Sequence, residues 1–325
     1  MAPSLNRRRF IGISAAAAGL SLLPIGQAGT AEAPAVTWRG QALGAPASLV
    51  IHHHDRAAAQ RLFRSTVVEV ERLESIFSLY RPDSTLAELN RIGTLAAPPA
   101  DLVALLQASA EFWEASGGAF DPTVQPLWLL YAAHFSKPGA DPAGPSAERL
   151  REVIELVGLG NVRFNRDRIV LGRPGMGLTF NGIAQGYIAD RIVDLLRNGG
   201  IEKSLVDMGE IRALGTRPDG HPWKVGVANT ADDAGPIEIL ELADRAVATS
   251  SPDGFHFDQA GRFTHLLDPR SGRGARFYQS VTVIAREATT ADALSTAFSL
   301  LEPSHVQQIV ANRPEVQVRL LAKER

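Results

Sequence analysis

The sequence predicts a protein of the α+β class, in which helices and mostly hairpin-connected strands are mixed along one chain. In several segments apolar residues recur every three or four positions, which is typical of helices packed on a core. Other short segments, separated by turn residues, are rich in Val, Ile and Thr or alternate apolar and polar residues, which indicates strands. No repeat or sharp linker divides the 325 residues, which are enough for one large domain or two average ones.

The composition excludes several classes of function. A formal net charge of -2 argues against a nucleic-acid partner, because such proteins normally carry a clear basic excess. Cysteine is absent, which removes disulfides, thiolate nucleophiles and zinc-thiolate sites, so any metal would be bound by oxygen or imidazole. No internal segment has the length and apolar content of a membrane span.

The N-terminus has the layout of an export signal. Arg7, Arg8 and Arg9 precede Phe10, a weakly hydrophobic run follows over 11–23, and small residues come next. This pattern predicts a twin-arginine-type signal peptide over 1–33, which exports folded proteins, and one domain over 34–325. We therefore expect a periplasmic protein without stable membrane insertion after cleavage. A basic amphipathic tail or an uncleaved anchor is the alternative.

The first half of the domain contains the clearest helices. Strands are expected within 37–54, where His52, His53 and His54 cannot chelate one ion together because neighbouring strand residues point to opposite faces. Helices are expected over 57–80 and 101–115, the second capped by Asp101. A glycine-containing loop over 116–123 follows, then a Gly/Pro-rich surface segment over 138–145 and a third helix over 146–157.

The second half alternates strands and helices more quickly. A hairpin is expected over 162–172, a helix from near Asn181 to the Gly199-Gly200 pair, and a strand and turn over 203–215. Two helices over 290–301 and 304–311 and a closing strand over 316–321 complete the domain. The remaining strand candidates are 223–229, 245–251, 255–258, 262–268 and 279–285.

Three sites carry polar groups that could do chemistry. Asp292 and Thr296 are four residues apart near a helix start, so their oxygens share one face and could bind Mg²⁺, although an acidic residue there is commonly just a favourable charge. Gly182 and Gly186 open another helix, which permits either close approach of a phosphate or close helix packing. His265 could act as a base or pack in the core.

Seven stretches together alter the interpretation of these sites. In order they are "SLYRPDSTLAELN", "GGAFDPTVQPLW", "NGIAQGYIADR", "LVDMGEIRALG", "VATSS", "THLLDPRSG" and "ADALSTA". With these spacings the chain resembles the ApbE family of FAD:protein FMN transferases over essentially its whole length after the signal peptide. In sequence, the third and fourth stretches are most similar to the NosX-type branch, which is associated with nitrous oxide respiration.

The resemblance implies a fold, a reaction and a partner. The fold would be the ApbE type, T-fold-like, with mixed antiparallel sheets and flanking helices. The reaction would be Mg²⁺-dependent cleavage of FAD, in which FMN passes to a Thr or Ser hydroxyl in the flavinylation motif of an exported or membrane flavoprotein and AMP is released.

The resemblance also implies a role for individual residues. Asp292, Thr296 and the backbone carbonyl of Gly182 would bind the metal, and His265 would be the general base. Contacts to FAD would come from Leu43, Tyr80, Ala119, Phe120, Asp121, Thr179, Gln185 and Leu266.

The chain departs from the family pattern at two places. Where the family commonly has "DLGGIAKGY", this chain has "TFNGIAQGY", so Thr179, Asn181 and Gln185 replace an acidic residue, a glycine and a lysine. The family's Gly-Gly after the next strand is Gly209-Glu210 here. Glu210 could compensate for the missing acidic residue, or it could pair with Arg212 on the surface.

Two alternatives to the transferase remain at this stage. The same metal site could hydrolyse FAD to FMN and AMP in the periplasm, or the protein could be a non-catalytic FAD-binding assembly protein. A pure binder would need no base, so Asp292, Thr296 and His265 argue against the second alternative. We also expect that the chain does not flavinylate itself at Ser295, its nearest match to an acceptor segment.

Overall fold

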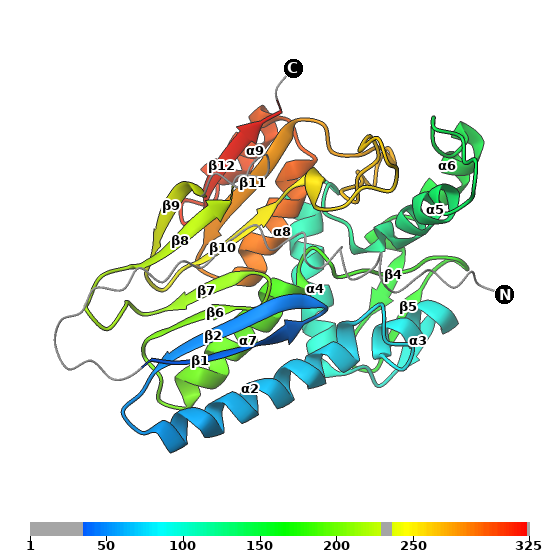
Figure 1. Ribbon diagram of the computed structural model, residues 1–325. Coiled ribbons are helices and arrows are strands. Elements are labelled where there is room, and N and C mark those ends of the chain that lie inside the picture. Colours follow the sequence, from blue (N-terminus) through cyan, green and yellow to red (C-terminus); the bar gives the residue numbers. More distant parts are fainter. Residues whose placement is uncertain (1–34, 229–235, 324–325) are drawn as a thin grey trace.

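The large sheet of this protein has seven strands, all antiparallel, in the order β1-β2-β6-β7-β10-β11-β12 (Figure 1). The computed structural model describes residues 35–228 and 236–323, so the predicted signal peptide lies outside the described residues. The strands are β1 (Ala35–Ala42), β2 (Ala45–His52), β6 (Ser204–Asp207), β7 (Ile211–Leu214), β10 (Ala246–Ser250), β11 (Tyr278–Ala285) and β12 (Gln317–Ala322).

Side chains along the central strands point alternately to the two faces of this sheet, so that each face packs against a different hydrophobic core. On β10, Ala246 and Ala248 belong to the main core with the helices, whereas Val247 between them belongs to a second core. Helices α2 (Arg56–Phe77), α7 (Ala184–Asn198) and α8 (Ala288–Ser299) cover the first face (Figure 1). The hairpin of β8 (Trp223–Ala228) and β9 (Pro236–Leu242) packs over the second core.

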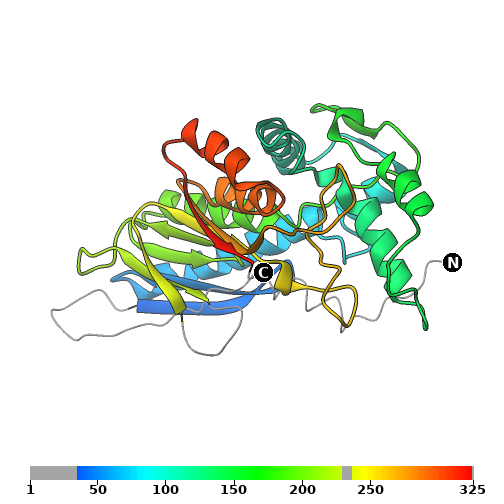
Figure 2. The same cartoon turned by 90° about the horizontal axis from the view of Figure 1, so that it is seen from above.

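A mainly helical region lies beside one end of the large sheet (Figures 1 and 2). It contains a small antiparallel sheet of order β3-β5-β4, whose short strands bring residues 94–96 against the hairpin of residues 162–171. Its elements are α3 (Thr85–Ile92), β3 (Thr94–Ala96), α4 (Ala100–Ala115), the short 3₁₀ helix η1 (Pro122–Val124), α5 (Gln125–Phe135), α6 (Ala147–Ile154), η2 (Leu159–Asn161), β4 (Val162–Phe164) and β5 (Arg168–Leu171).

The predicted α+β class is confirmed, but several local predictions were wrong. The segments 255–258 and 262–268 are not strands: after η3 (Pro252–Gly254) they form an irregular loop with isolated bridges between His256 and Thr264 and between Leu267 and Gly274. The sequence patterns missed α3, β3, α5 and β9. Helix α5 was missed because it is apolar on all sides and therefore shows no 3.6-residue alternation.

Asp101 does not cap α4, contrary to expectation. The cap position is Pro99, which offers no side-chain hydrogen bond. Asp101 lies in the first turn, where it accepts a 2.7 Å hydrogen bond from the Tyr187 hydroxyl and pairs with Arg72 at 2.8 Å. Its carboxylate therefore links α4 to α7 and α2.

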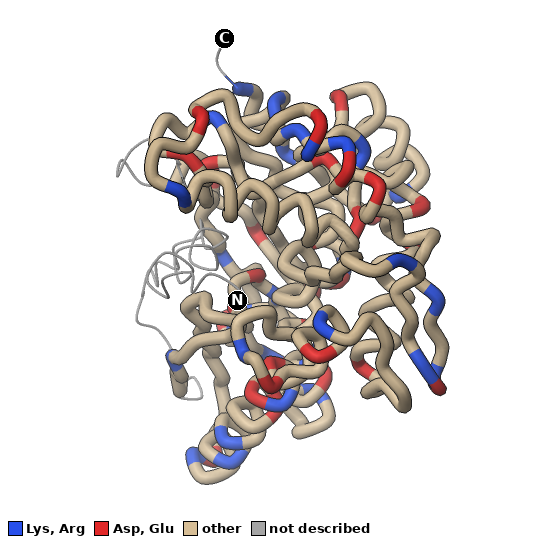
Figure 3. The backbone as a smooth tube through the Cα atoms, turned by 90° about the vertical axis from the view of Figure 1, so that its right-hand side faces the viewer, with Lys and Arg blue, Asp and Glu red and all other residues tan. Residues whose placement is uncertain are grey.

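Two features of the described residues bear on possible partners. No helix among them has the length and apolar character that a membrane crossing requires. On the side shown in Figure 3, Lys and Arg are interspersed with Asp and Glu rather than gathered in one basic patch. This distribution agrees with the small net charge.

The last strand and helices close the large sheet. Helix α8 packs on α7, β10 and β11, and α9 (Pro303–Ala311) leads into β12 at the sheet edge. Helices α7 and α8 approach each other closely at Gly186. A Cβ atom added there would lie only 2.3 Å from the carbonyl oxygen of Ala288. This contact brings together two segments more than a hundred residues apart.

Candidate active site

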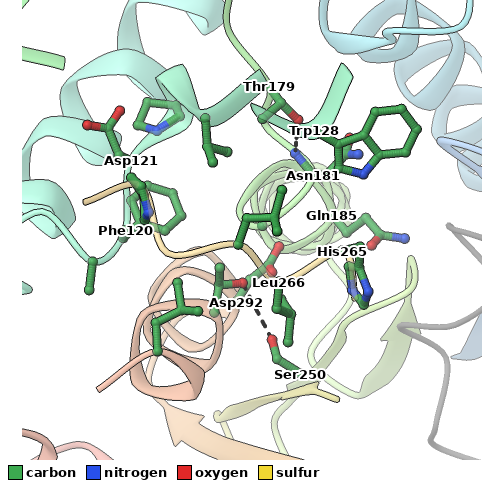
Figure 4. A pocket seen from close by; sticks show the side chains of 18 of the residues that line it. Phe120, Asp121, Trp128, Thr179, Asn181, Gln185, Ser250, His265, Leu266 and Asp292 are labelled. Atoms are coloured by element: carbon green, nitrogen blue, oxygen red, sulfur yellow. Dashed lines mark hydrogen bonds between the residues drawn. The ribbon is translucent and has the colours of Figure 1, made fainter. Parts of the chain in front are cut away.

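One cavity collects nearly all residues that the sequence patterns single out. It lies where α7, α8, the loop after η3 and the turn between β1 and β2 meet, and Figure 4 shows His265, Leu266 and Asp292 around it. Tyr80 is the exception, since it does not line the cavity. The predicted site residues that do are Leu43, Ala119, Phe120, Asp121, Thr179, Gly182, Gln185, His265, Leu266, Asp292 and Thr296.

The three residues predicted to bind a metal lie together at one part of this cavity. A side chain at Gly182 would come within 2.7 Å of Thr296 Oγ1, so the two residues are in contact. Asp292 is one helical turn before Thr296 on α8. Its Oδ2 accepts a 3.0 Å hydrogen bond from the Gly186 amide, which orients the carboxylate from the facing helix.

Burial makes the carboxyl groups here unusually basic. Desolvation raises the pKa of Asp292 to about 7, although the Gly186 hydrogen bond opposes this shift. Desolvation also raises the pKa of Glu210 well above its ordinary value, and the nearby charges of Asp292 and Asp207 add to the effect. Buried carboxylates that repel one another favour a proton or a cation between them.

The described residues hold no group of three or more His, Cys, Asp or Glu side chains arranged to bind a metal ion. The predicted set contains only one carboxylate, with one hydroxyl and one carbonyl, so it does not need such a group. Mg²⁺ commonly takes few protein oxygens and completes its shell with water and substrate phosphates. The buried Asp292 carboxylate beside the Thr296 hydroxyl fits that coordination chemistry.

His265 faces the same cavity from the irregular loop. Its Nδ1 is 3.3 Å from the carbonyl oxygen of Phe255, and its backbone amide donates to the same oxygen at 3.2 Å. Burial of the ring lowers the pKa of His265 to about 4, although the Phe255 contact opposes this shift. The imidazole is therefore neutral at pH 7 and can accept a proton.

Leu43 reaches the cavity through a strained turn. Its φ of 50° lies in the left-handed region that non-glycine residues seldom adopt. Its backbone amide donates a 2.5 Å hydrogen bond to Glu74 Oε1 on α2, which holds the turn in place. Tyr80 is linked to the cavity through Asn181, a lining residue with which its side chain hydrogen-bonds.

Asp121 lines the cavity, but both of its carboxylate oxygens serve the surrounding chain. Oδ1 accepts hydrogen bonds from the amide and hydroxyl of Thr123 at 2.8 and 2.5 Å, and Oδ2 accepts from the Leu159 amide at 3.0 Å. Asp121 thereby shapes the loop that presents Ala119 and Phe120. The predicted contact of Asp121 with FAD stays a prediction.

The segment that departs from the family pattern forms another wall. The Thr179 hydroxyl accepts a 3.2 Å hydrogen bond from the Asn181 amide, and the Thr179 amide donates to the Pro122 carbonyl at 2.7 Å. Gln185 is buried, and its Nε2 has no hydrogen-bond partner among the described residues. This amide nitrogen is therefore available to a ligand oxygen.

The structure adds residues to the site that sequence reasoning missed. Trp128 on α5 lines the cavity and stacks on Phe255 with the ring centroids 6.2 Å apart. Ser250, in the quoted "VATSS" stretch, places its hydroxyl 2.8 Å from Ser295 Oγ and 3.4 Å from Thr296 Oγ1. The motif was a signal for Ser250, but Trp128 belongs to the helix that lacked a periodic pattern.

Glu210 also lines the cavity, which decides between the two alternatives for this residue. It is 3% exposed, and Arg212 pairs instead with Asp190 at 2.8 Å. The predicted surface pair of Glu210 and Arg212 is therefore wrong. The cavity therefore receives the Glu210 carboxylate in addition to that of Asp292.

Comparisons with known proteins agree with this arrangement. The ApbE family model matches residues 43–320 of the chain. A FAD:protein FMN transferase of Treponema pallidum is 32% identical over 254 residues, which cover 71% of this chain and 69% of that protein. Another, from Vibrio cholerae, is 30% identical over 261 residues, with coverage of 78% and 77%.

Solved structures show the same fold. The flavinyl transferase ApbE of Pseudomonas stutzeri, in its apo form, superimposes with a TM-score of 0.77 at 27% identity, covering 92% of this chain and 94% of that one. The ApbE protein of Thermotoga maritima gives a TM-score of 0.79 at 28% identity, with coverage of 89% and 94%.

Proposed function

Because this chain belongs to the ApbE family, we propose that it transfers FMN from FAD to a Thr or Ser hydroxyl of an acceptor flavoprotein and releases AMP. The observation that carries the proposal is the composition of the cavity described above. It is lined by the Asp292 carboxylate, the Thr296 hydroxyl and the His265 imidazole, and also by apolar side chains such as Phe120 and Leu266. FAD combines an anionic pyrophosphate with a large aromatic ring, and this cavity offers complementary groups for both.

The reaction moves one phosphoryl-linked group. The acceptor hydroxyl oxygen forms a bond to the phosphorus of the FMN half, and the bond from that phosphorus to the bridging oxygen breaks. The bridging oxygen leaves with AMP. His265 takes the proton that the hydroxyl loses, because an aliphatic hydroxyl is a poor nucleophile while protonated.

The low pKa of His265 favours the neutral imidazole that the step needs at its start, but it disfavours the imidazolium that the step produces. With a pKa of about 4 the imidazole is neutral at pH 7 and free to accept a proton, but burial then disfavours the imidazolium. The anionic pyrophosphate of bound FAD would stabilise the imidazolium and raise its pKa toward the working pH. Bound FAD would thus make His265 a stronger base.

Mg²⁺ is the cation that these donors suit. Asp292 would hold it through a carboxylate already oriented by Gly186, with Thr296 and the Gly182 carbonyl as neutral oxygen ligands. When bound, Mg²⁺ supplies charge neutralisation at the pyrophosphate and a better leaving group. Gln185 Nε2 can donate to a ligand oxygen in place of the lysine that the family commonly has.

We further propose an exported location and a respiratory context. The Arg7, Arg8, Arg9 and Phe10 pattern supports export by the twin-arginine route to the periplasm. The sequence of residues 181–191 and 205–215 supports the NosX-like branch, and hence service to nitrous oxide respiration. The acceptor would then be an exported or membrane flavoprotein that presents its Thr or Ser motif on the periplasmic side.

Co-expression with a candidate exported flavoprotein tests the proposal. Denatured acceptor should show flavin fluorescence in a gel, the signal should require FAD and Mg²⁺, and Asp292→Ala should abolish it. A dark acceptor accompanied by conversion of FAD to FMN and AMP would identify a hydrolase. FAD binding without turnover or transfer would identify a binding protein.

A further inference from the structure

Glu210 enters the cavity from a tight turn between β6 and β7. Gly209 adopts a φ of +96°, and its amide donates a 3.0 Å hydrogen bond to Asp207 Oδ1. The Met208 amide donates to the Glu210 carbonyl at 3.1 Å. These bonds fix the turn, so Glu210 lies immediately before β7 with its side chain enclosed and only 3% of the residue exposed.

The Glu210 carboxylate is incompletely satisfied by the protein. It accepts a hydrogen bond from the Thr249 amide, but Oε2 has no hydrogen-bond partner among the described residues. Nor does any basic side chain in residues 35–228 and 236–323 form an ion pair with it, since Arg212 is held by Asp190. A buried carboxylate oxygen without a partner is costly, so a partner from outside the chain is expected.

The position of this oxygen indicates which partner. Three carboxylates line the cavity: those of Asp121, Glu210 and Asp292. Asp121 is engaged through both oxygens, whereas Glu210 keeps Oε2 without a partner among the described residues, in the cavity that Asp292 also lines. A divalent cation held by the carboxylates of Glu210 and Asp292 would give Oε2 a ligand.

We propose that Glu210 supplies a second carboxylate ligand to the divalent cation held by Asp292 and Thr296. This inference rests on the proposed function, because it concerns the same cation. It gives this chain a site of higher negative charge than Asp292 alone provides, so the cation can bind before FAD does. A ligand set of two carboxylates and a hydroxyl favours Mg²⁺ or Mn²⁺ over softer ions.

Titration of Mn²⁺ alone, followed by electron paramagnetic resonance of the free ion, tests the inference without any turnover. The wild-type protein should bind Mn²⁺, and Glu210→Gln and Glu210→Gly should each weaken binding by about tenfold or more. Asp292→Asn should weaken it at least as much. Glu202→Gln is the matched control, because Glu202 is exposed just ahead of β6, and it should leave Mn²⁺ affinity unchanged.

Thermal unfolding separates a ligand from a merely structural carboxylate. Without cation, Glu210→Gln should be at least as stable as the wild type, since it removes a buried carboxylate whose Oε2 has no hydrogen-bond partner among the described residues. Added Mg²⁺ should raise the melting temperature of the wild type more than that of this variant. A structural role predicts the reverse order without cation.

The outcomes are distinct for the two proposals. If both Glu210 variants bind Mn²⁺ as tightly as the wild type, Glu210 is not a metal ligand. The proposal is also wrong if the wild type does not bind Mn²⁺ in the absence of FAD. In either case Mg²⁺-dependent labelling of the acceptor would leave the proposed function standing. Failure of the wild type to label any acceptor or cleave FAD would overturn the proposed function whatever the Mn²⁺ result.

Discussion

Gly182 and Thr296 are in direct contact across the candidate metal site, although they are separated by more than a hundred residues. A Cβ at position 182 would lie 2.7 Å from Thr296 Oγ1 and 3.0 Å from its Cγ2. The loop before α7 and the middle of α8 therefore approach as closely as two segments can. This contact brings the backbone of Gly182 and the hydroxyl of Thr296 next to the buried carboxylate of Asp292.

Gly182→Ala should remove most of the transfer activity while leaving the protein folded. The new methyl group would displace the Thr296 hydroxyl, and a displacement of about 1 Å at a reacting site can cost about 10²-fold in rate. Acceptor labelling measures the effect. Gly160→Ala is the control, because nothing lies within 4 Å of a Cβ there; equal activity of the two variants would argue against the contact.

His265→Ala should lower the transfer rate by about 10² to 10⁴-fold, the usual cost of losing a general base. FAD binding should persist, because His265 is not among the residues predicted to contact FAD. The measurement is initial-rate labelling together with FAD binding by equilibrium titration. His256→Ala, in the same loop but outside the cavity, should retain activity; a comparable loss there would show that loop disruption, not a missing base, is responsible.

The buried state of His265 should appear in the pH dependence of stability. Its folded pKa is about 4, below the value near 6.5 of an unfolded histidine, so between these values the unfolded chain binds more protons. Stability from this group is fully present above pH 6.5 and is lost as the pH falls toward 4. We expect the wild type to lose up to about 3 kcal/mol relative to His265→Asn over that interval.

Urea unfolding at several pH values between about 4 and 7 measures this difference. Other titrating groups, including Asp292, are common to both proteins and cancel in the comparison. Parallel stability curves for wild type and variant would mean that the ring is accessible to water in the folded protein.

Asp190 should be a major determinant of stability. It pairs with Arg212 at 2.8 Å and accepts hydrogen bonds from the Ala288 amide and from the amide and hydroxyl of Thr289, so it caps α8 from the facing helix. Asp190→Ala should cost about 3–5 kcal/mol, because it leaves Arg212 buried without a partner. Asp194→Ala, on the exposed side of the same helix, should cost below about 1 kcal/mol by chemical denaturation.

The purified chain should carry no covalent flavin after incubation with FAD and Mg²⁺. Ser295 is 1% exposed, and its hydroxyl is engaged with Ser250 Oγ at 2.8 Å and the Asp292 carbonyl at 3.0 Å. An acceptor hydroxyl must reach the phosphorus from a flexible segment. Intact-mass spectrometry checks this, and an added mass of one FMN would refute it.

Much of the fold was predictable because its signals are local. The helices near 57–80 and 290–301 and the hairpin near 162–172 were predicted from periodicity and turn residues, to within a few positions. The seven ordered stretches predicted the family, which the family model confirms. The roles of His265, Asp292 and Thr296 stay predictions, although the structure brings all three to one cavity.

Other features depended on contacts that no local pattern contains. Asp101 resembles a helix cap in the sequence, but it bonds to Tyr187 and Arg72 because α2, α4 and α7 meet there. The segments 255–258 and 262–268 have strand composition, yet they form the loop that carries His265. Strand propensity was overridden by the packing of the loop against α5.

By itself the sequence determined the class of fold, the family and the residue types of the site, because these follow from periodicity and from ordered motifs. The tertiary structure alone decided which charged groups lose their water and which partners they then find. Glu210 shows the difference: the sequence left two roles open for it, and its burial in the cavity, with Arg212 already paired to Asp190, excluded the surface pair with Arg212. Desolvation depends on everything packed around a group, so it becomes definite only when the whole chain has folded.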